Sequence, residues 1–144
     1  MSALALAAII MASCAVEEVK IDYGNDDCAF CKMKIVDKKF SAEIVNEHGK
    51  AFKFDAIECL LRYIKLDMIE KNSIGLMLVA VFTEEDKLVD AKKASYVISE
   101  DIPSPMGAFL SAYQTPEDAR NALNGKDGEV MDWKGLLGRF RLEL

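Results

Sequence analysis

A strand–loop–strand–helix pattern in the first half of the chain restricts its fold more than any other feature of the sequence. Residues 40–45 and 51–54 roughly alternate polar and apolar side chains, which predicts two short strands. The residues between them, Asn-Glu-His-Gly-Lys, are typical of a hairpin loop. Apolar side chains then recur at helical spacing over residues 55–71, and Asp55 with Glu58 has the pattern of a capping box. The segment therefore predicts a hairpin followed by an amphipathic helix.

The second half of the chain repeats the order of strands and then a helix. Four segments are predicted to be extended, because they are short apolar or alternating runs bounded by turn residues: 76–82, 94–98, 106–113 and 129–133. A second helix is predicted between Thr115, an N-cap residue followed by proline, and a stop at Gly125. The repeated order predicts an α+β domain over residues 28–144, made of two small ββα-type modules packed together, roughly 28–75 and 76–144. Each module is expected to have a short mixed or antiparallel sheet and one helix.

The N-terminus has the pattern of a secretory signal. Residues 3–12 are apolar, but as a helix they would span only about 15 Å, half of a bilayer core of roughly 30 Å. They therefore fit the apolar region of a signal peptide that covers residues 1–13. The Met-Ala-Ser-Cys sequence that ends at Cys14 looks like a bacterial lipobox, in which a peptidase cuts before the cysteine and the thiol receives a lipid. A buried N-terminal helix is the alternative interpretation.

Residues 14–27 are predicted to be a tether between the lipid and the folded domain. They are rich in turn residues and have no periodic apolar face, so the folded body is expected to start near Cys28. A lipidated Cys14 would anchor the protein to the outer or the cytoplasmic membrane, with the domain facing the periplasm or another extracytoplasmic space.

Composition and motifs argue against two classes of function. The chain has 24 acidic and 18 basic residues and a net charge of -6, the opposite of the basic surface that binds nucleic acid. It also has a single histidine, no glycine-rich phosphate loop and no Gly-x-Ser-x-Gly sequence, and nothing in the sequence brings His48 to a cysteine. The sequence therefore predicts a protein that binds no nucleic acid and is not an enzyme.

The chemistry of the chain is concentrated in the motif Cys28-Ala-Phe-Cys31-Lys-Met33. Two cysteines at this spacing can share one metal ion or form one disulfide. A c-type haem is excluded, because it needs a histidine directly after Cys31 and a lysine stands there. A structural zinc site needs four ligands and would have to recruit Cys59 and His48. A thioredoxin-like redox pair belongs at the start of a helix after a strand, whereas the residues that follow Cys31 are charged and β-like.

Methionines favour a copper site over these alternatives. On an extended segment Cys31 and Met33 would lie on the same face, and thiolate with thioether selects Cu(I) over zinc, calcium or magnesium. Met106 is predicted to reach the site from the second module, because its turn between proline and glycine offers an apolar side chain little packing. Core packing is the alternative for both methionines. Cys59 is expected to be a buried small apolar residue and His48 a solvated loop residue, so neither is assigned as a ligand.

These motifs, in this order, resemble the NosL family, the nitrous oxide reductase accessory lipoproteins. The resemblance covers roughly residues 28–133 and rests on these elements: the lipoprotein-like start, the Cys-x-x-Cys-x-Met motif, Phe54-Asp55-Ala56-Ile57-Glu58-Cys59, Val89-Asp90-Ala91, Ala94-Ser95-Tyr96-Val97 and Ser104-Pro105-Met106-Gly107-Ala108-Phe109. It implies two ββα-type modules similar to part of alkylmercury lyase. It also implies Cu(I) binding by Cys31 and Met33, with Cys28 as the first cysteine of the motif and Met106 in the family's proline-methionine-glycine element. Lys32 departs from the family's usual glycine, and a lysine fits an extended conformation better than a turn with positive φ.

Two hypotheses about function remain. The resemblance implies a membrane-tethered protein, similar to copper chaperones, that delivers Cu(I) to nitrous oxide reductase or to another extracytoplasmic copper acceptor. The alternative is an extracytoplasmic thiol-disulfide protein that acts through Cys28 and Cys31. Replacing Met33 by leucine separates the two hypotheses, because only the copper site uses a thioether.

Overall fold

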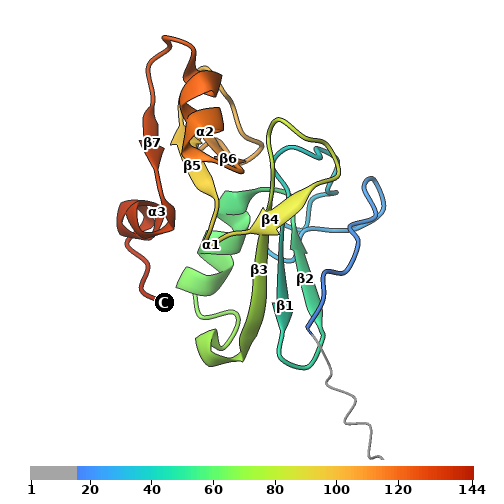
Figure 1. Ribbon diagram of the computed structural model, residues 1–144. Helices are drawn as coiled ribbons and strands as arrows, with labels where there is room; N and C mark the ends of the chain where they lie inside the picture. The colour runs from blue at the N-terminus through green and yellow to red at the C-terminus, as the bar shows by residue number, and fades with distance from the viewer. Residues whose placement is uncertain (1–15) are drawn as a thin grey trace, which may run out of the picture.

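A four-stranded antiparallel sheet forms the first half of the protein. The computed structural model describes residues 16–144 and is shown in Figure 1. The strands of this sheet are β1 (Ala42–Asn46), β2 (Ala51–Phe54), β3 (Ile74–Ala80) and β4 (Leu88–Asp90), in the spatial order β2-β1-β3-β4. The helix α1 (Ile57–Lys65) follows β2, and a short 3-10 helix, η1 (Lys71–Ser73), leads into β3.

A three-stranded antiparallel sheet forms the second half. Its strands are β5 (Ser95–Ile98), β6 (Leu110–Tyr113) and β7 (Glu129–Met131), in the order β6-β5-β7. The helix α2 (Pro116–Leu123) follows β6, and α3 (Trp133–Phe140) follows β7 (Figure 1). Thr115 caps α2 through its side chain, as the sequence predicts. The α+β fold is therefore confirmed, and both sheets are antiparallel throughout.

The second unit has two helices instead of the one expected. No element is predicted beyond residue 133, yet Trp133–Phe140 form α3. Asp132 supplies the local reason, because its carboxylate accepts a hydrogen bond from the N–H of Gly135 at 2.8 Å. This is the side-chain bond of a helix N-cap, which satisfies one of the free N–H groups of the first turn.

The boundary between the two units lies after β4, and not between residues 75 and 76. The strand β3 pairs with β1 from Ala42–Val79 to Val45–Leu76, and β4 pairs in turn with β3. Both strands therefore complete the first sheet, which the sequence assigned only two strands. The apolar run of β3 therefore lies in the interior of the sheet, with β1 on one edge and β4 on the other.

The helix α1 is shorter than the predicted span of 55–71. Its N-cap is Ala56, without a side-chain hydrogen bond, so the capping box predicted from Asp55 and Glu58 does not form. At the other end, Asp67 has a φ of 51° and the N–H of Met68 bonds to the carbonyl of Tyr63 at 3.1 Å. A left-handed residue with such a bond is a common way to end a helix. Met68 consequently lies beyond the helix and is exposed rather than in the core.

One continuous hydrophobic core joins the two units. The helix α1 packs against the first sheet through its apolar face, and this cluster extends to residues of the second sheet and of α3. The fully buried members with the largest side chains include Ile44, Phe54, Ile57, Leu60, Ile64, Tyr96, Leu110 and Leu136. Cys28 and Cys59 belong to the same cluster, so the cysteine motif is seated on the core rather than at its edge.

The segment of residues 16–27 is packed on the first sheet, and the tether predicted over residues 14–27 is therefore too long. Ile21 is buried in the core, and the hydroxyl of Tyr23 lies 2.9 Å from that of Ser41. The N–H of Val19 donates to the carboxylate of Glu43 at 3.0 Å. The folded body thus begins well before Cys28, because a few apolar side chains and backbone bonds hold a segment that has no periodic pattern of its own.

Glu43 makes the stability of the fold depend on pH. Burial raises the pKa of this carboxyl to about 7, against the opposing hydrogen bond from Val19, and Glu18, Lys53 and Asp26 are the charged groups nearby. The folded state therefore keeps its proton where the unfolded chain has lost it, so the free energy of unfolding falls as the pH rises from about 4.5 to 7. The wild type loses this stability as the pH rises, whereas Glu43→Gln has no proton to lose. When the pH rises from 5 to 8, we therefore expect the free energy of unfolding of Glu43→Gln to increase by about 2 kcal/mol relative to that of the wild type.

Urea unfolding at the two pH values measures this difference. Glu47→Gln is a matched control, because Glu47 is exposed in the turn directly after the same strand. An equal pH dependence in the wild type and in Glu43→Gln would assign the effect to another group.

Three predictions about the N-terminus lie outside the described residues. The signal peptide, its cleavage before Cys14 and the lipid on Cys14 all fall within residues 1–15. Within residues 16–144, no helix has the length and apolar character needed to cross a membrane.

Candidate metal centre

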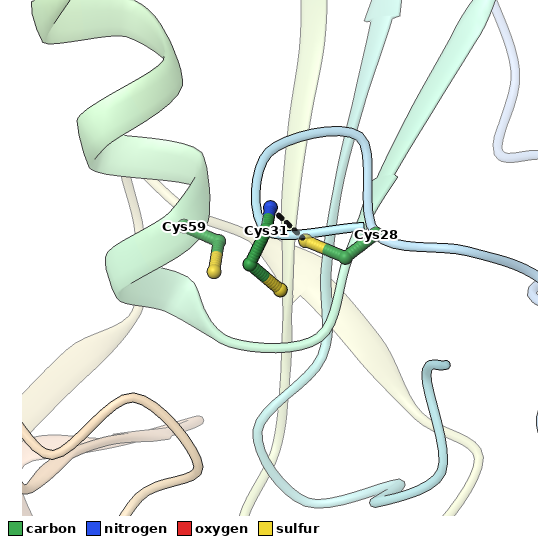
Figure 2. A group of neighbouring side chains, drawn as sticks. All are labelled: Cys28, Cys31 and Cys59. Atoms are coloured by element: carbon green, nitrogen blue, oxygen red, sulfur yellow. Dashed lines mark hydrogen bonds between the residues drawn. The ribbon is translucent and has the colours of Figure 1, made fainter. Parts of the chain in front are cut away.

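Three cysteine side chains converge where the motif loop meets the helix α1 (Figure 2). Cys28 and Cys31 come from the loop that precedes β1, and Cys59 comes from the first turn of α1. Their three sulfur atoms all lie within 4.8 Å of one another. All three cysteines are free thiols in this structure. Three thiols at this separation can converge on a single metal ion with small side-chain movements.

Backbone hydrogen bonds shape the loop that carries Cys28 and Cys31. The N–H of Cys28 bonds to the carbonyl of Met33 at 2.8 Å, and the N–H of Lys32 bonds to the carbonyl of Cys28 at 3.0 Å. The N–H of Cys31 points at the sulfur of Cys28, at 3.5 Å (Figure 2). The N–H of Ala29 bonds to the carbonyl of Lys53 at 2.8 Å, which fastens the loop to β2. The thiols are therefore held by a tight turn anchored on the first sheet.

The prediction that Cys31 and Met33 share one face of an extended segment is wrong. Lys32, which lies between them, has a φ of 64°, in the left-handed region. Such a residue turns the chain instead of extending it, and a side chain at this φ raises the energy by about 1–2 kcal/mol. The glycine that the NosL resemblance implies at this position would carry no such strain. The lysine adopts the glycine-like conformation because the hydrogen bonds of the turn require it, and its ammonium group donates to the carbonyl of Ala29 at 2.7 Å.

Replacements of Lys32 test this strained turn. We expect Lys32→Gly to change the free energy of unfolding by less than about 1 kcal/mol, because the relieved strain is offset by the greater freedom of glycine in the unfolded chain. Lys32→Val should lower it by about 2 kcal/mol, since a β-branched side chain tolerates positive φ poorly. Chemical unfolding measures both. The same two replacements at Lys34, which does not have a positive φ, should show no such preference for glycine.

The three thiols differ in the direction in which their pKa values are shifted. The hydrogen bond with the Cys59 thiol lowers the pKa of Cys28, burial opposes it, and the N–H groups of Asp55, Cys31 and Phe30 lower the pKa further. The same contact with Cys28 raises the pKa of Cys59, and burial raises the pKa of Cys31. Of the three thiols, Cys28 is therefore the one whose thiolate form is favoured, by hydrogen bonds from the Cys59 thiol and from backbone amides of the motif loop and of Asp55.

Two buried carboxyl groups flank this cluster. Asp55 and Glu58 are both almost fully buried, and burial raises the pKa of each. Asp55 Oδ1 and Glu58 Oε2 have no hydrogen-bond partner. Glu58 Oε1 accepts a hydrogen bond from the hydroxyl of Ser104, which belongs to the second unit. A buried polar atom without a partner is uncommon in proteins, so both carboxyl groups are held here at a cost in free energy.

The two methionines predicted as ligands differ in their surroundings. Met33 is 55% exposed, on the outer side of the loop next to Cys31. Met106 lies in the turn between β5 and β6, is partly buried, and packs against the core cluster that contains Cys28 and Cys59. Their roles as ligands stay predictions.

His48 is exposed, as expected. It lies in the hairpin turn before β2, whereas the thiols lie at the opposite end of that strand.

Cys59 belongs to the thiol cluster, although the sequence did not assign it as a ligand. Cys59 is buried, as predicted, but its sulfur faces the two motif cysteines rather than apolar side chains alone. The signal was present in the sequence, because a cysteine in the first turn of a helix sits near the strand end that precedes the helix. Only the docking of the motif loop on β2 brings the other two thiols to that point.

Comparison with known proteins relates this geometry to one family. A family model described as NosL matches residues 18–137. A solved structure described as the copper chaperone NosL from Shewanella denitrificans superposes with a TM-score of 0.69 at 15% sequence identity, over 81% of this chain and 93% of that one. At this identity the likeness speaks for the fold alone. No curated protein sequence matched the chain. Because the family model covers most of the sequence, including the cysteine loop and the helix that carries Cys59, the chain belongs to the NosL family.

Proposed function

We propose that this protein binds Cu(I) through Cys28, Cys31 and Cys59 and carries it to an extracytoplasmic copper acceptor. The observation that carries the proposal is the convergence of three thiol sulfur atoms within 4.8 Å of one another. Thiolates are the ligands that Cu(I) prefers, and the hydrogen bonds that lower the pKa of Cys28 favour this form.

The donor set favours Cu(I) over zinc. Zinc in a structural site takes four ligands, commonly with imidazole or carboxylate among them. Within residues 16–144, no histidine, aspartate or glutamate joins the three cysteines in the group of candidate ligand atoms. Cu(I) is satisfied by two or three soft sulfur ligands, so the cluster offers it a complete site where zinc lacks a fourth partner.

Access to the site supports a carrier rather than a permanent metal centre. Cys28 and Cys59 are fully buried, whereas Cys31 is partly exposed and Met33 is largely exposed. A copper ion at the three thiols could thus be approached by an incoming ligand from the side of Cys31. Met33 and Met106 are proposed as weaker thioether ligands, which take part as the ion enters or leaves.

The destination and the location of the protein are also proposals. The related structure is described as a copper chaperone, and the NosL resemblance implies nitrous oxide reductase or another copper protein as the acceptor. We propose that Cys14 carries a lipid and that residues 1–13 are removed as a signal peptide. The strap of residues 16–27 would then lead from the membrane surface directly onto the first sheet.

The lowered pKa of Cys28 also favours a second candidate, a thiol-disulfide protein. In such proteins the reactive thiolate is the exposed member of the pair. Here the thiol with the lowered pKa is fully buried, and the partly exposed Cys31 has a raised pKa. This distribution of charge suits a metal ligand set better than an attacking nucleophile.

Anaerobic titration of the reduced protein with Cu(I) against a competing chelator tests the proposed function. The chain should carry Cys14→Ala, so that only the three clustered thiols contribute. We expect one tightly bound Cu(I) with an X-ray absorption spectrum dominated by sulfur, and preference for Cu(I) over Zn(II). Met33→Leu should weaken copper retention but leave the reactivity toward a small disulfide unchanged. A first shell of nitrogen and oxygen, or displacement of Cu(I) by Zn(II), would contradict the proposal.

A further inference from the structure

A single buried hydrogen bond connects the turn that carries Met106 to the turn that carries Cys59. The hydroxyl of Ser104 bonds to the carboxyl of Glu58 across 46 positions in the sequence. Glu58 immediately precedes Cys59 in the first turn of α1, and Ser104 begins the turn that contains Met106. The two units of the fold thus meet at a polar contact that lies one residue from Cys59 and two residues from Met106 in the sequence.

Glu58 and Ser104 are both shielded from water. Glu58 is fully buried and Ser104 is nearly so. A hydrogen bond in such surroundings has no solvent molecule to replace either partner, so its loss leaves a buried polar group without a partner. The contact therefore constrains the relative position of the two turns far more strongly than an exposed bond would.

Further bonds make the turn of the second unit rigid around this contact. The N–H of Gly107 bonds to the carbonyl of Ser104 at 3.1 Å, and the N–H of Leu110 points at the Ser104 hydroxyl at 3.4 Å. Ser104 lies two residues before Met106, so its bond to Glu58 holds this turn close to the methionine.

We infer that Glu58 is a positioning residue of the copper site, which sets the Met106 turn against the α1 turn that carries Cys59. The inference rests on the proposed function, and it adds a part of the molecule that holds no metal itself. Without this contact, Met106 would remain attached to a turn that is free to move relative to the thiols. Copper would then leave the site faster although every sulfur ligand is still present.

A double-mutant cycle on the rate of Cu(I) release tests the inference. The copper-loaded full chain with Cys14→Ala is mixed with excess chelator, and the release rate of the folded protein is followed. We expect Ser104→Ala and Met106→Ala each to speed release roughly tenfold, which corresponds to about 1.4 kcal/mol in the barrier to release. The double variant should release copper no faster than either single variant, because both changes remove the same interaction.

Further variants separate positioning from folding. Glu58→Leu removes the carboxyl without leaving a buried polar group in α1, and it should speed release like Ser104→Ala. Ser104→Thr keeps the hydroxyl and should restore the slow rate. Ser111→Ala is the matched control, since Ser111 is another buried serine of the second unit, bonded to Tyr113 instead. Its release rate should equal that of the wild type.

The outcomes distinguish the inference from the proposed function. If the double variant releases copper about as fast as the product of the two single effects, the positioning role is overturned while copper binding stands. A wild-type release rate in folded Ser104→Ala and Glu58→Leu has the same meaning. The same holds if these variants lose only thermal stability in the apo form. A wild type that binds no Cu(I) would overturn the proposed function and the inference with it.

Discussion

Replacing Cys59 by alanine is expected to weaken Cu(I) binding by about two to three orders of magnitude, because one of three thiolates is lost from a site whose ligands each contribute several kcal/mol. Cys59 lies within 4.8 Å of the other two sulfur atoms, although the sequence motif does not include it. Competition for Cu(I) with a chelator of known affinity measures the loss. Alanine is preferred to serine here because it puts no hydroxyl into a fully buried position.

The control for Cys59→Ala is Ile57→Val on the same turn of α1. It removes a buried methylene and should lower stability by about 1 kcal/mol without changing copper affinity. An unchanged affinity in Cys59→Ala, together with a large loss in Met106→Ala, would restore the ligand set predicted from the sequence. That set comprised Cys28, Cys31, Met33 and Met106.

Replacing Cys14 by serine is expected to move the protein entirely from the membrane fraction to the soluble fraction of a bacterial host. Each buried methylene of an acyl chain contributes about 0.8 kcal/mol of membrane affinity, so a lipid with two or more chains anchors the protein stably and its loss releases it. Growth with labelled fatty acid followed by fractionation measures both effects. The wild type should carry the label and the variant should not.

Cys59→Ser is the matched control for the lipid experiment, since it removes a cysteine within the folded body and should keep the label. An unlabelled wild type that stays in the cytosol with residues 1–13 attached would show that the N-terminus is not a lipoprotein signal. The copper site itself would be unaffected by that result.

Local patterns were sufficient for much of the fold. The β1-β2 hairpin, α1 and α2 were predicted because alternation, helical spacing and Thr115 as a cap act over a few neighbouring residues. The predicted ends of α1 were wrong for the same reason: Asp55 has the right residue type for a cap, but the observed N-cap is Ala56, without a side-chain hydrogen bond.

Local patterns could not predict which strands pair with one another in each sheet. The apolar run that became β3 was recognised as a buried strand, but its partner β1 lies some thirty positions earlier. The packing of residues 16–27 on the first sheet was likewise hidden, because Ile21 and the backbone of Val19 find their partners only after the sheet exists.

The sequence by itself determined the order of the elements apart from β4 and α3, and the Cys-x-x-Cys-x-Met motif with its soft sulfur side chains. Those properties depend on residue types and on spacings within one segment. Only the tertiary structure decided that Cys59 completes the group, that Lys32 takes a left-handed conformation, and that Glu58 ties the second unit to the site. Each of these depends on docking the motif loop and the second unit against α1. The free energy of that docking comes from a core shared by residues far apart in the chain, which no local pattern encodes.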